Sequence, residues 1–139
     1  MDAFDSDVLI YAAVPGHSLG RRVTALVTAG PARAPAGTGS VLLLPEVLGK
    51  PLRDGAAGEI RILAALLARL DLRPFDLATA ELATSLAARY KLKAADAAHL
   101  ATAVVAGADR FITNNRRDFP REITEVDITY PDDLSDPGT

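Results

Sequence analysis

Four acidic residues stand at the borders of short apolar runs, where a carboxylate needs a partner. Asp5 opens DSDVLIYA, Glu46 follows VLLLP, Asp96 lies within KAADAAHLATA, and Asp118 lies within FITNNRRDF. Carboxylates that gather in one place repel each other unless a divalent cation lies between them. The pattern therefore predicts a metal-dependent enzyme.

The ligand preferences of Mg²⁺ suggest which of these acids would bind the ion directly and which would act through water. Mg²⁺ prefers oxygen ligands and keeps several of its waters, so one or two direct carboxylates are enough to bind it. We expect Asp5 and Asp96 to be the direct ligands. Glu46 and Asp118 would bind through water, or position and deprotonate the attacking water. Such a site stabilises the charge that develops on phosphoryl oxygens, which favours phosphate chemistry.

Residues next to the acids extend the candidate set. We expect Ser6 to cap the following helix or to orient Asp5. Asp7 either joins the outer layer of the site or caps the same helix. His99 lies three residues after Asp96 and shares its helix face. We interpret His99 as a partly packed or surface histidine, with a general-base role as the alternative.

The elements that must position these acids alternate between strands and helices. Apolar runs bounded by Gly and Pro predict strands, and apolar residues at 3.6-residue spacing predict helices. We expect strands at Met1–Phe4, Val41–Leu44, 71–76, Arg110–Thr113 and Glu125–Tyr130. We expect helices at Val8–Ala13, at Ser18–Ala29 with Ser18 as the N-cap, from Pro45, and at Ala57–Leu70, Leu77–Tyr90 and Ala95–Ala106, with a loop over residues 30–39.

This alternation predicts an α/β fold with a parallel sheet, right-handed crossovers and helices on both faces. Ligands bind at the carboxyl ends of the strands in such sheets. Three of the acids follow strands, and Asp96 begins a helix, where the dipole favours a carboxylate. All four are therefore predicted to face one edge of the sheet. We expect one domain over residues 1–131 and a disordered tail over residues 132–139.

Bulk properties exclude several classes of protein. The chain has 139 residues and no cysteine, which excludes disulfides and thiolate metal sites. Its first residues lack the order of a signal peptide, and no apolar run is long enough to span a membrane. We expect a soluble, cytoplasmic protein with no membrane partner. The net charge of −3 argues against a general nucleic-acid binder, although basic residues recur near the acids.

The segments FDSDVLIYA, LLLPEVL, KAADAAHLATA and FITNNRRDF resemble, in order and spacing, the signature segments of PIN-domain ribonucleases. More narrowly, they are similar to those of VapC toxins from bacterial VapBC toxin–antitoxin modules. The resemblance extends from Asp5 to Tyr130. It implies a PIN-like three-layer sandwich with a central parallel sheet of about five strands, and Mg²⁺- or Mn²⁺-dependent hydrolysis of RNA phosphodiester bonds. By motif match, the first three acids of the family fall on Asp5, Glu46 and Asp96.

The fourth acid is where this chain departs from the family pattern. Many relatives read T-x-D there, whereas here Thr113 is followed by two asparagines that end at Asn115. Asp118 lies three residues later in a motif that also occurs among relatives. The resemblance leaves this position to either Asp118 or Asn115, and leaves open whether one or two metals bind. Arg116 and Arg117, between these candidates, are predicted to hold an RNA phosphate.

As a toxin, the protein would have a VapB-like antitoxin whose C-terminal segment brings an Arg or Lys to the carboxylates, and it would form a homodimer. Apolar helix positions after Glu46, at Leu63, Leu66 and Leu70, serve either these contacts or the core. Nothing in the sequence specifies the RNA target.

Three other functions compete with this interpretation. One is a PIN-like module that has lost catalysis and binds RNA or protein, which Asn115 keeps open. Another is a PIN nuclease that processes RNA outside a toxin–antitoxin pair. A haloacid-dehalogenase-type phosphatase fits poorly, because Leu9 stands where its D-x-D motif requires Thr or Val and no later segment supplies its remaining residues.

Overall fold

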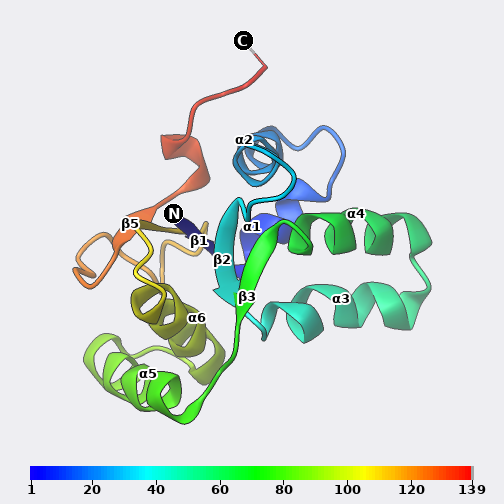
Figure 1. Ribbon diagram of the computed structural model, residues 1–139. Helices are drawn as coiled ribbons and strands as arrows, with labels where there is room; N and C mark the ends of the chain where they lie inside the picture. The colour runs from blue at the N-terminus through cyan, green and yellow to red at the C-terminus, as the bar shows by residue number, and fades with distance from the viewer. Residues whose placement is uncertain (139) are drawn as a thin grey trace.

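The computed structural model describes residues 1–138, which form six α-helices, five strands and a short 3₁₀ helix. Figure 1 shows these elements in chain order. The strands are β1 (Asp2–Phe4), β2 (Gly37–Ser40), β3 (Leu70–Arg73), β4 (Arg110–Ile112) and β5 (Asp127–Thr129). The helices are α1 (Ser6–Ala12), α2 (Ser18–Val27), α3 (Leu43–Asp54), α4 (Ala57–Leu67), α5 (Leu77–Tyr90), α6 (Ala94–Val105) and the 3₁₀ helix η1 (Pro131–Asp133).

The sheet is parallel throughout, with β1 at its centre. Its strand order is β3-β2-β1-β4-β5, and every neighbouring pair runs in the same direction. Phe4 lies opposite Ile112 in the pairing of β1 with β4. The residues that follow these two strands, Asp5 and Thr113, therefore emerge side by side at the carboxyl edge of the sheet.

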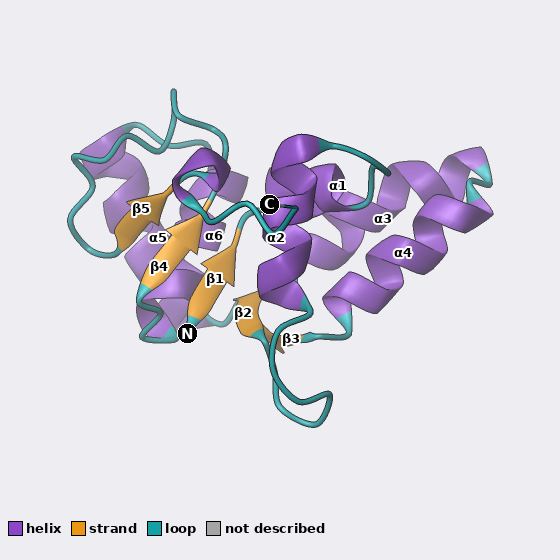
Figure 2. Ribbon diagram, turned by 90° about the horizontal axis from the view of Figure 1, so that it is seen from above, coloured by secondary structure: helices purple, strands orange, loops and turns teal. Residues whose placement is uncertain are grey.

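Helices cover both faces of the sheet, which gives the three-layer α/β sandwich that the sequence predicts. Successive residues of a strand point to opposite faces, and the core is accordingly divided in two. Ala3 and Phe111 pack with the buried residues of α5 and α6. Phe4 and Ile112 pack instead with the buried residues of α1, α2, α3 and α4. Figure 2 shows α5 and α6 behind the strands, and α1 to α4 on the other side.

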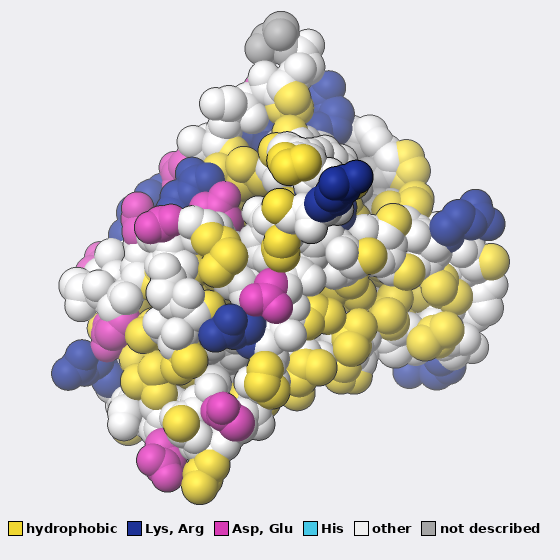
Figure 3. Space-filling model, in the orientation of Figure 1, with side chains coloured by type: hydrophobic (Ala, Val, Ile, Leu, Met, Phe, Trp, Pro, Cys, Tyr) yellow, Lys and Arg dark blue, Asp and Glu magenta, His cyan; other side chains and the backbone are white. Residues whose placement is uncertain are grey.

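The α3–α4 hairpin extends away from the sheet. Gly55 ends α3 in the left-handed conformation, with φ of 66°, and α4 begins two residues later. A glycine adopts this φ at little cost. The inward residues Leu43, Val47 and Leu63 are buried, whereas Leu52 and Ile62 on the same hairpin are 60% and 40% exposed. Figure 3 shows hydrophobic side chains gathered on this side of the molecule.

The second strand lies earlier in the chain than the sequence predicts. We expect a strand at Val41–Leu44, but β2 is Gly37–Ser40 and begins inside the segment predicted to be a loop. Leu43 already belongs to α3. The reason is a close approach of backbones. A Cβ on Gly37 would lie 2.6 Å from the carbonyl oxygen of Asp2. Glycine therefore lets β2 lie close to β1, and the apolar run is used to begin a helix.

Two smaller expectations are also wrong. The N-cap of α2 is His17, whose Nδ1 accepts a hydrogen bond from the N–H of Gly20 at 3.1 Å, and not Ser18. The expected disordered tail differs from the structure at its start, where Asp133 belongs to η1 and accepts from the backbone N–H of Tyr130 at 2.9 Å. Leu134 is buried in the core beside α2. Residue 139 lies outside the described residues.

Among residues 1–138, no helix is both long enough and apolar enough to cross a lipid bilayer.

Gly20 tests the packing that holds α2 against α1. A Cβ at this position would lie 2.2 Å from the carbonyl oxygen of Tyr11, so Gly20→Ala forces the two helices apart. We expect the free energy of unfolding to fall by about 1–3 kcal/mol, the usual cost of overpacking. Urea unfolding monitored by circular dichroism measures it.

The matched control is Gly49→Ala, also inside a helix but with nothing within 4 Å of the added Cβ. This variant is expected to gain about 0.5–1 kcal/mol from helix propensity. Equal effects of the two substitutions would contradict the packing argument.

Candidate active site

Asp5 is the most deeply buried of the predicted site acids, with 3% of its surface exposed. It stands between β1 and α1, where its Oδ1 accepts the backbone N–H of Ser6 at 2.8 Å. Its Oδ2 accepts the hydroxyl of Thr113 at 2.8 Å, across from the end of β4. Burial raises the pKa of Asp5, even though these hydrogen bonds and the charge of His99 act in the opposite direction. The carboxylate is thus fixed in orientation but incompletely compensated in charge.

Asp7 is a half-buried carboxylate close to Asp5. Its Oδ2 accepts the backbone N–H of Asn114 at 3.1 Å, which ties the start of α1 to the loop after β4. Its Oδ1 is buried and has no hydrogen-bond partner among the described residues. Burial, followed by the charges of Asp5 and Asp96, raises the pKa of Asp7 to about 7. The structure therefore places Asp7 within the acidic cluster.

Asp96 reaches the same cluster from the other side of the sheet. It lies in the first turn of α6, as the sequence predicts. Burial raises the pKa of Asp96, and the charges of Asp5, Asp118 and Glu46 raise it further. Because these carboxylates affect one another, they share one local electrostatic environment.

Glu46 comes from the first turn of α3 and is held by a histidine. Nε2 of His99 is hydrogen-bonded to Oε1 of Glu46. The hydrogen bond from His99 lowers the pKa of Glu46, so the glutamate is ionised at neutral pH. Burial acts against the charged form of His99, but the hydrogen bond to Glu46 and the nearby charges outweigh it and raise the pKa of His99.

His99 is the one site residue whose role the sequence analysis missed. It is 2% exposed, so it is more deeply buried than expected, and it packs against a site carboxylate. The signal was its position three residues after Asp96 on the same helix face. Its partner Glu46 lies 53 residues away in the chain, a contact that local spacing does not indicate.

The fourth corner of the site contains both candidates together. Nδ2 of Asn115 donates to Oδ2 of Asp118 at 3.0 Å, and the backbone N–H of Asp118 donates to Oδ1 of Asn115 at 3.3 Å. The N–H of Asn115 in turn donates to the hydroxyl of Thr113 at 3.1 Å. A chain of hydrogen bonds therefore runs from Asp5 through Thr113 and Asn115 to Asp118.

Three arginines in this part of the chain differ in their surroundings. Arg116 pairs with Asp132 and lies over the ring of Tyr130, 4.4 Å from its centroid. Arg121 pairs with Asp133 and lies 4.5 Å from the centroid of the same ring. Arg117 is exposed and makes no ion pair with any described residue. Arg116 is thus already engaged in holding η1 to the loop, and only Arg117 remains free.

The donor chemistry of the cluster fits Mg²⁺, but the residues do not form a complete cage. Among the described residues, no three His, Asp or Glu side chains stand in a geometry that would ligate one ion together. Mg²⁺ keeps several waters and needs only one or two carboxylates, so a complete cage is not required. The unpartnered Oδ1 of Asp7 and the mutual repulsion of the carboxylates are both features that a cation would relieve.

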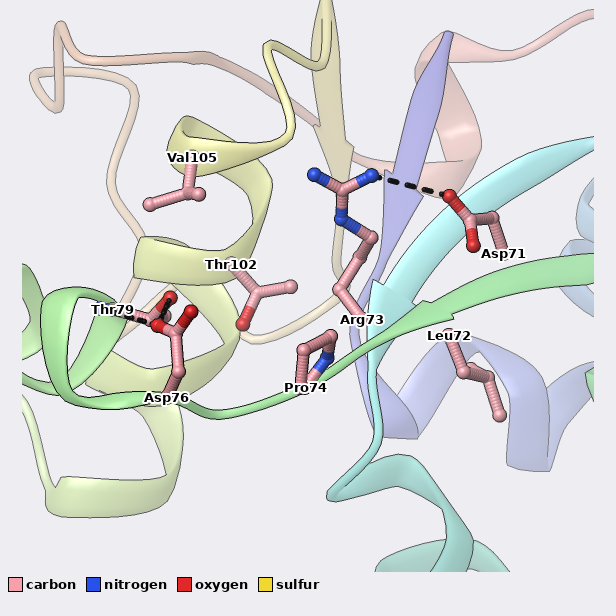
Figure 4. A pocket seen from close by; sticks show the side chains of 8 residues that line it. All are labelled: Asp71, Leu72, Arg73, Pro74, Asp76, Thr79, Thr102 and Val105. Carbon is pink, nitrogen blue, oxygen red and sulfur yellow. Dashed lines mark hydrogen bonds and ion pairs between the residues drawn. The ribbon is translucent and has the colours of Figure 1, made fainter.

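A separate hollow of about 270 Å³ lies at the free edge of β3. Arg73 and Asp71 form an ion pair at 3.3 Å. Figure 4 shows this pair together with Asp76, Thr79 and Thr102, which also line the hollow. None of the predicted site acids lines this hollow. The acidic cluster and this hollow are therefore different features of the molecule.

A family model matches most of this chain. The model described as PIN domain matches residues 3–122, which include all four predicted acids. The chain belongs to the PIN domain family. Among curated proteins, none matches it.

Solved structures with a similar fold include a chain of a toxin–antitoxin complex and chains of two complexes bound to DNA. The chain is 27% identical to one in a toxin–antitoxin complex from Klebsiella pneumoniae, with a TM-score of 0.73 over 94% of this chain and 98% of that one. A chain of VapBC2 from Rickettsia felis bound to a promoter DNA fragment is 15% identical, with a TM-score of 0.70 over 93% and 97%. A chain of FitAB bound to an IR36 DNA fragment is 22% identical, with a TM-score of 0.65 over 94% and 95%. The last two show the PIN fold alone.

The crowding of carboxylates predicts a pH-dependent stability for this PIN domain without metal. The pKa of Asp7 is about 7 in the folded state and about 3.9 in the unfolded state. The folded state therefore holds more protons between these values, and stability is lost as the pH rises from 4 to 7. Asp7→Asn removes this loss and still accepts from Asn114. We expect its free energy of unfolding at pH 8 to be higher by about 1–3 kcal/mol.

The measurement is urea unfolding in the presence of a chelator at several pH values between 4 and 8. The control is Asp54→Asn, at an exposed position where the carboxylate makes only surface ion pairs. A difference between Asp7→Asn and wild type that stays constant across this range would show that burial and the neighbouring charges do not raise the pKa of Asp7.

Proposed function

We propose that this PIN domain is a Mg²⁺- or Mn²⁺-dependent endoribonuclease and the toxin of a type II toxin–antitoxin pair. The observation that carries the proposal is the cluster of Asp5, Asp7, Glu46 and Asp96 at the carboxyl edge of the sheet. PIN domains are typically nucleases, and they generally use divalent metals. The similar chain from a toxin–antitoxin complex of Klebsiella pneumoniae supports the toxin role.

In this proposal the chain contributes binding, orientation and charge. Asp5 and Asp96 bind the cation, because burial raises the pKa of both carboxylates and a cation would compensate the negative charge that burial disfavours. When bound, the cation makes the attacking water more acidic and stabilises charge on the phosphoryl oxygens. Glu46 is ionised through its contact with His99, so it accepts a hydrogen bond from the water and orients it. The water oxygen loses one proton to solvent and forms a bond to phosphorus, the P–O bond to the leaving ribose oxygen breaks, and the leaving oxygen takes up one proton from solvent.

We assign the fourth position to Asp118 supported by Asn115. Asp118 carries the charge, which already acts on Asp96. Asn115 has no charge but holds the carboxylate of Asp118 through its amide. For the RNA phosphate, we propose Arg117 as the contact, since Arg116 is occupied by Asp132 and Tyr130.

This assignment predicts how two substitutions affect RNA cleavage and metal binding. Asp5→Asn and Asp96→Asn keep the size of the side chain but remove its charge. We expect each to slow cleavage of a labelled single-stranded RNA with Mg²⁺ by about 100-fold or more, the scale on which transition-state charge stabilisation is lost. Each should also weaken Mn²⁺ binding, measured by electron paramagnetic resonance, by about tenfold or more.

Asp54→Asn, on the exposed face of α3, is the matched control and should match wild type in both assays. A wild-type protein that binds RNA but cleaves none with either metal would overturn the nuclease proposal and favour a binding module. Cleavage that persists in Asp5→Asn would place the cation elsewhere.

The proposed partner is a VapB-like antitoxin, and we also propose a homodimer. The exposed apolar residues of the α3–α4 hairpin, among them Leu44, Leu52 and Ile62, lie on the same hairpin as Glu46 and could be covered by such partners. We expect a small protein from the adjacent gene to co-purify with this chain and to abolish RNA cleavage. Leu52→Ser is expected to weaken the complex by about tenfold or more, since interface anchors of this kind contribute over 1 kcal/mol.

Ala56→Ser, at the tip of the same hairpin, is the control for handling of the complex. Co-purification that leaves cleavage unchanged would contradict the antitoxin proposal. A nuclease with no such partner would fit a role in RNA processing.

A further inference from the structure

His99 is a buried polar residue that the assignment of four acids does not use. Its side chain is 1% exposed, and it lies in α6 among small buried residues such as Ala98 and Ala103. A polar group in such a place is costly unless it is hydrogen-bonded. Its Nε2 is bonded to Oε1 of Glu46, whereas its Nδ1 has no partner among the described residues. The contact with Glu46 is therefore the one interaction that compensates the burial of this ring.

The contact joins the two helical layers of the fold across the carboxyl edge of the sheet. α6 packs with the Ala3 and Phe111 side of the core, and α3 packs with the Phe4 and Ile112 side. The side chain of Glu46 is 34% exposed and would be free to rotate without a partner. Fixing a flexible glutamate costs rotamer entropy, and a hydrogen bond to a charged group is strong enough to offset it.

We propose that His99 is a positioning residue for Glu46: it donates from Nε2 to the carboxylate and holds it over the acidic cluster in the orientation that the reaction needs. This inference rests on the proposed nuclease function, and it assigns His99 a role through Glu46 alone. The ring does not reach the substrate from its buried position. Nε2 carries a proton in this contact, because it is the ring nitrogen that faces the carboxylate of Glu46.

A pair of substitutions separates positioning from packing. His99→Gln retains a donor at a similar distance from the helix, and His99→Leu fills the same space with no donor. We expect His99→Leu to lower kcat by about 10–100-fold with little change in KM, as for other residues that orient a catalytic ligand. His99→Gln is expected to recover most of that loss. Thr102→Val, one helical turn further along α6, controls for disturbance of the helix interior and should keep wild-type kcat.

A double-mutant cycle with Glu46→Gln then tests the route of the effect. If His99 acts through Glu46, His99→Leu should change the residual rate of Glu46→Gln by less than about twofold, since two residues that act as one unit are not additive. Full additivity of the two losses would overturn the proposal. So would a His99→Gln variant as slow as His99→Leu while both unfold at the wild-type temperature.

Nuclear magnetic resonance tests the contact between His99 and Glu46 without any cleavage assay. The chain has two histidines, and His17→Asn identifies the nitrogen resonances of His99. In metal-free wild type we expect the proton on Nε2, slowly exchanging, and Glu46→Gln should move its resonance. Glu59→Gln, in the first turn of α4, should not. An unchanged His99 resonance in Glu46→Gln would overturn the inference, whereas absence of RNA cleavage with the expected resonances would overturn only the nuclease function.

Discussion

The burial of the Asp5 carboxylate is the constraint on which this structure depends. A carboxylate taken out of water costs several kcal/mol unless hydrogen bonds replace its hydration. Asp5 receives one from the first N–H of α1 and one from the hydroxyl of Thr113. The hydroxyl of Thr113 is available because β1 pairs with β4 in the observed register, with Phe4 opposite Ile112. The central strand pair and the orientation of the acid thus require each other.

The surroundings of Asp5 make the site less stable than an ordinary core. Burial raises the pKa of both Asp7 and Asp96, the charge of Asp5 raises both further, and Oδ1 of Asp7 is buried without a partner among the described residues. Structural ion pairs would remove this repulsion, yet the arginines of the same loop pair with Asp132 and Asp133 instead. Excess negative charge that is left uncompensated in this way is typical of a site that binds a cation.

Sequence patterns located most of this architecture because the residues concerned act locally. α5 has the predicted bounds, and Asp96 lies in the first turn of α6, since capping and helical periodicity are determined by near neighbours. β2 was misplaced because its glycines are required by contact with β1, more than 30 residues away in the chain. The pairing of His99 with Glu46 was not foreseen for the same reason. What the sequence does not reveal here is contact between distant segments.

The position of Glu46 has a consequence for how the site is assembled. Asp5, Asp7 and Asp96 stand on elements that border the central strands, whereas Glu46 stands on a hairpin that extends away from the sheet. Leu44 and Glu46 lie in the first turn of the same helix, and Leu44 is partly exposed while Leu43 and Val47 anchor the turn in the core. A helical turn moves as a unit, because its backbone hydrogen bonds connect each residue to the next turn. Any contact that shifts the outer face of α3 therefore also shifts the carboxylate of Glu46, unless α6 holds that carboxylate from the other side.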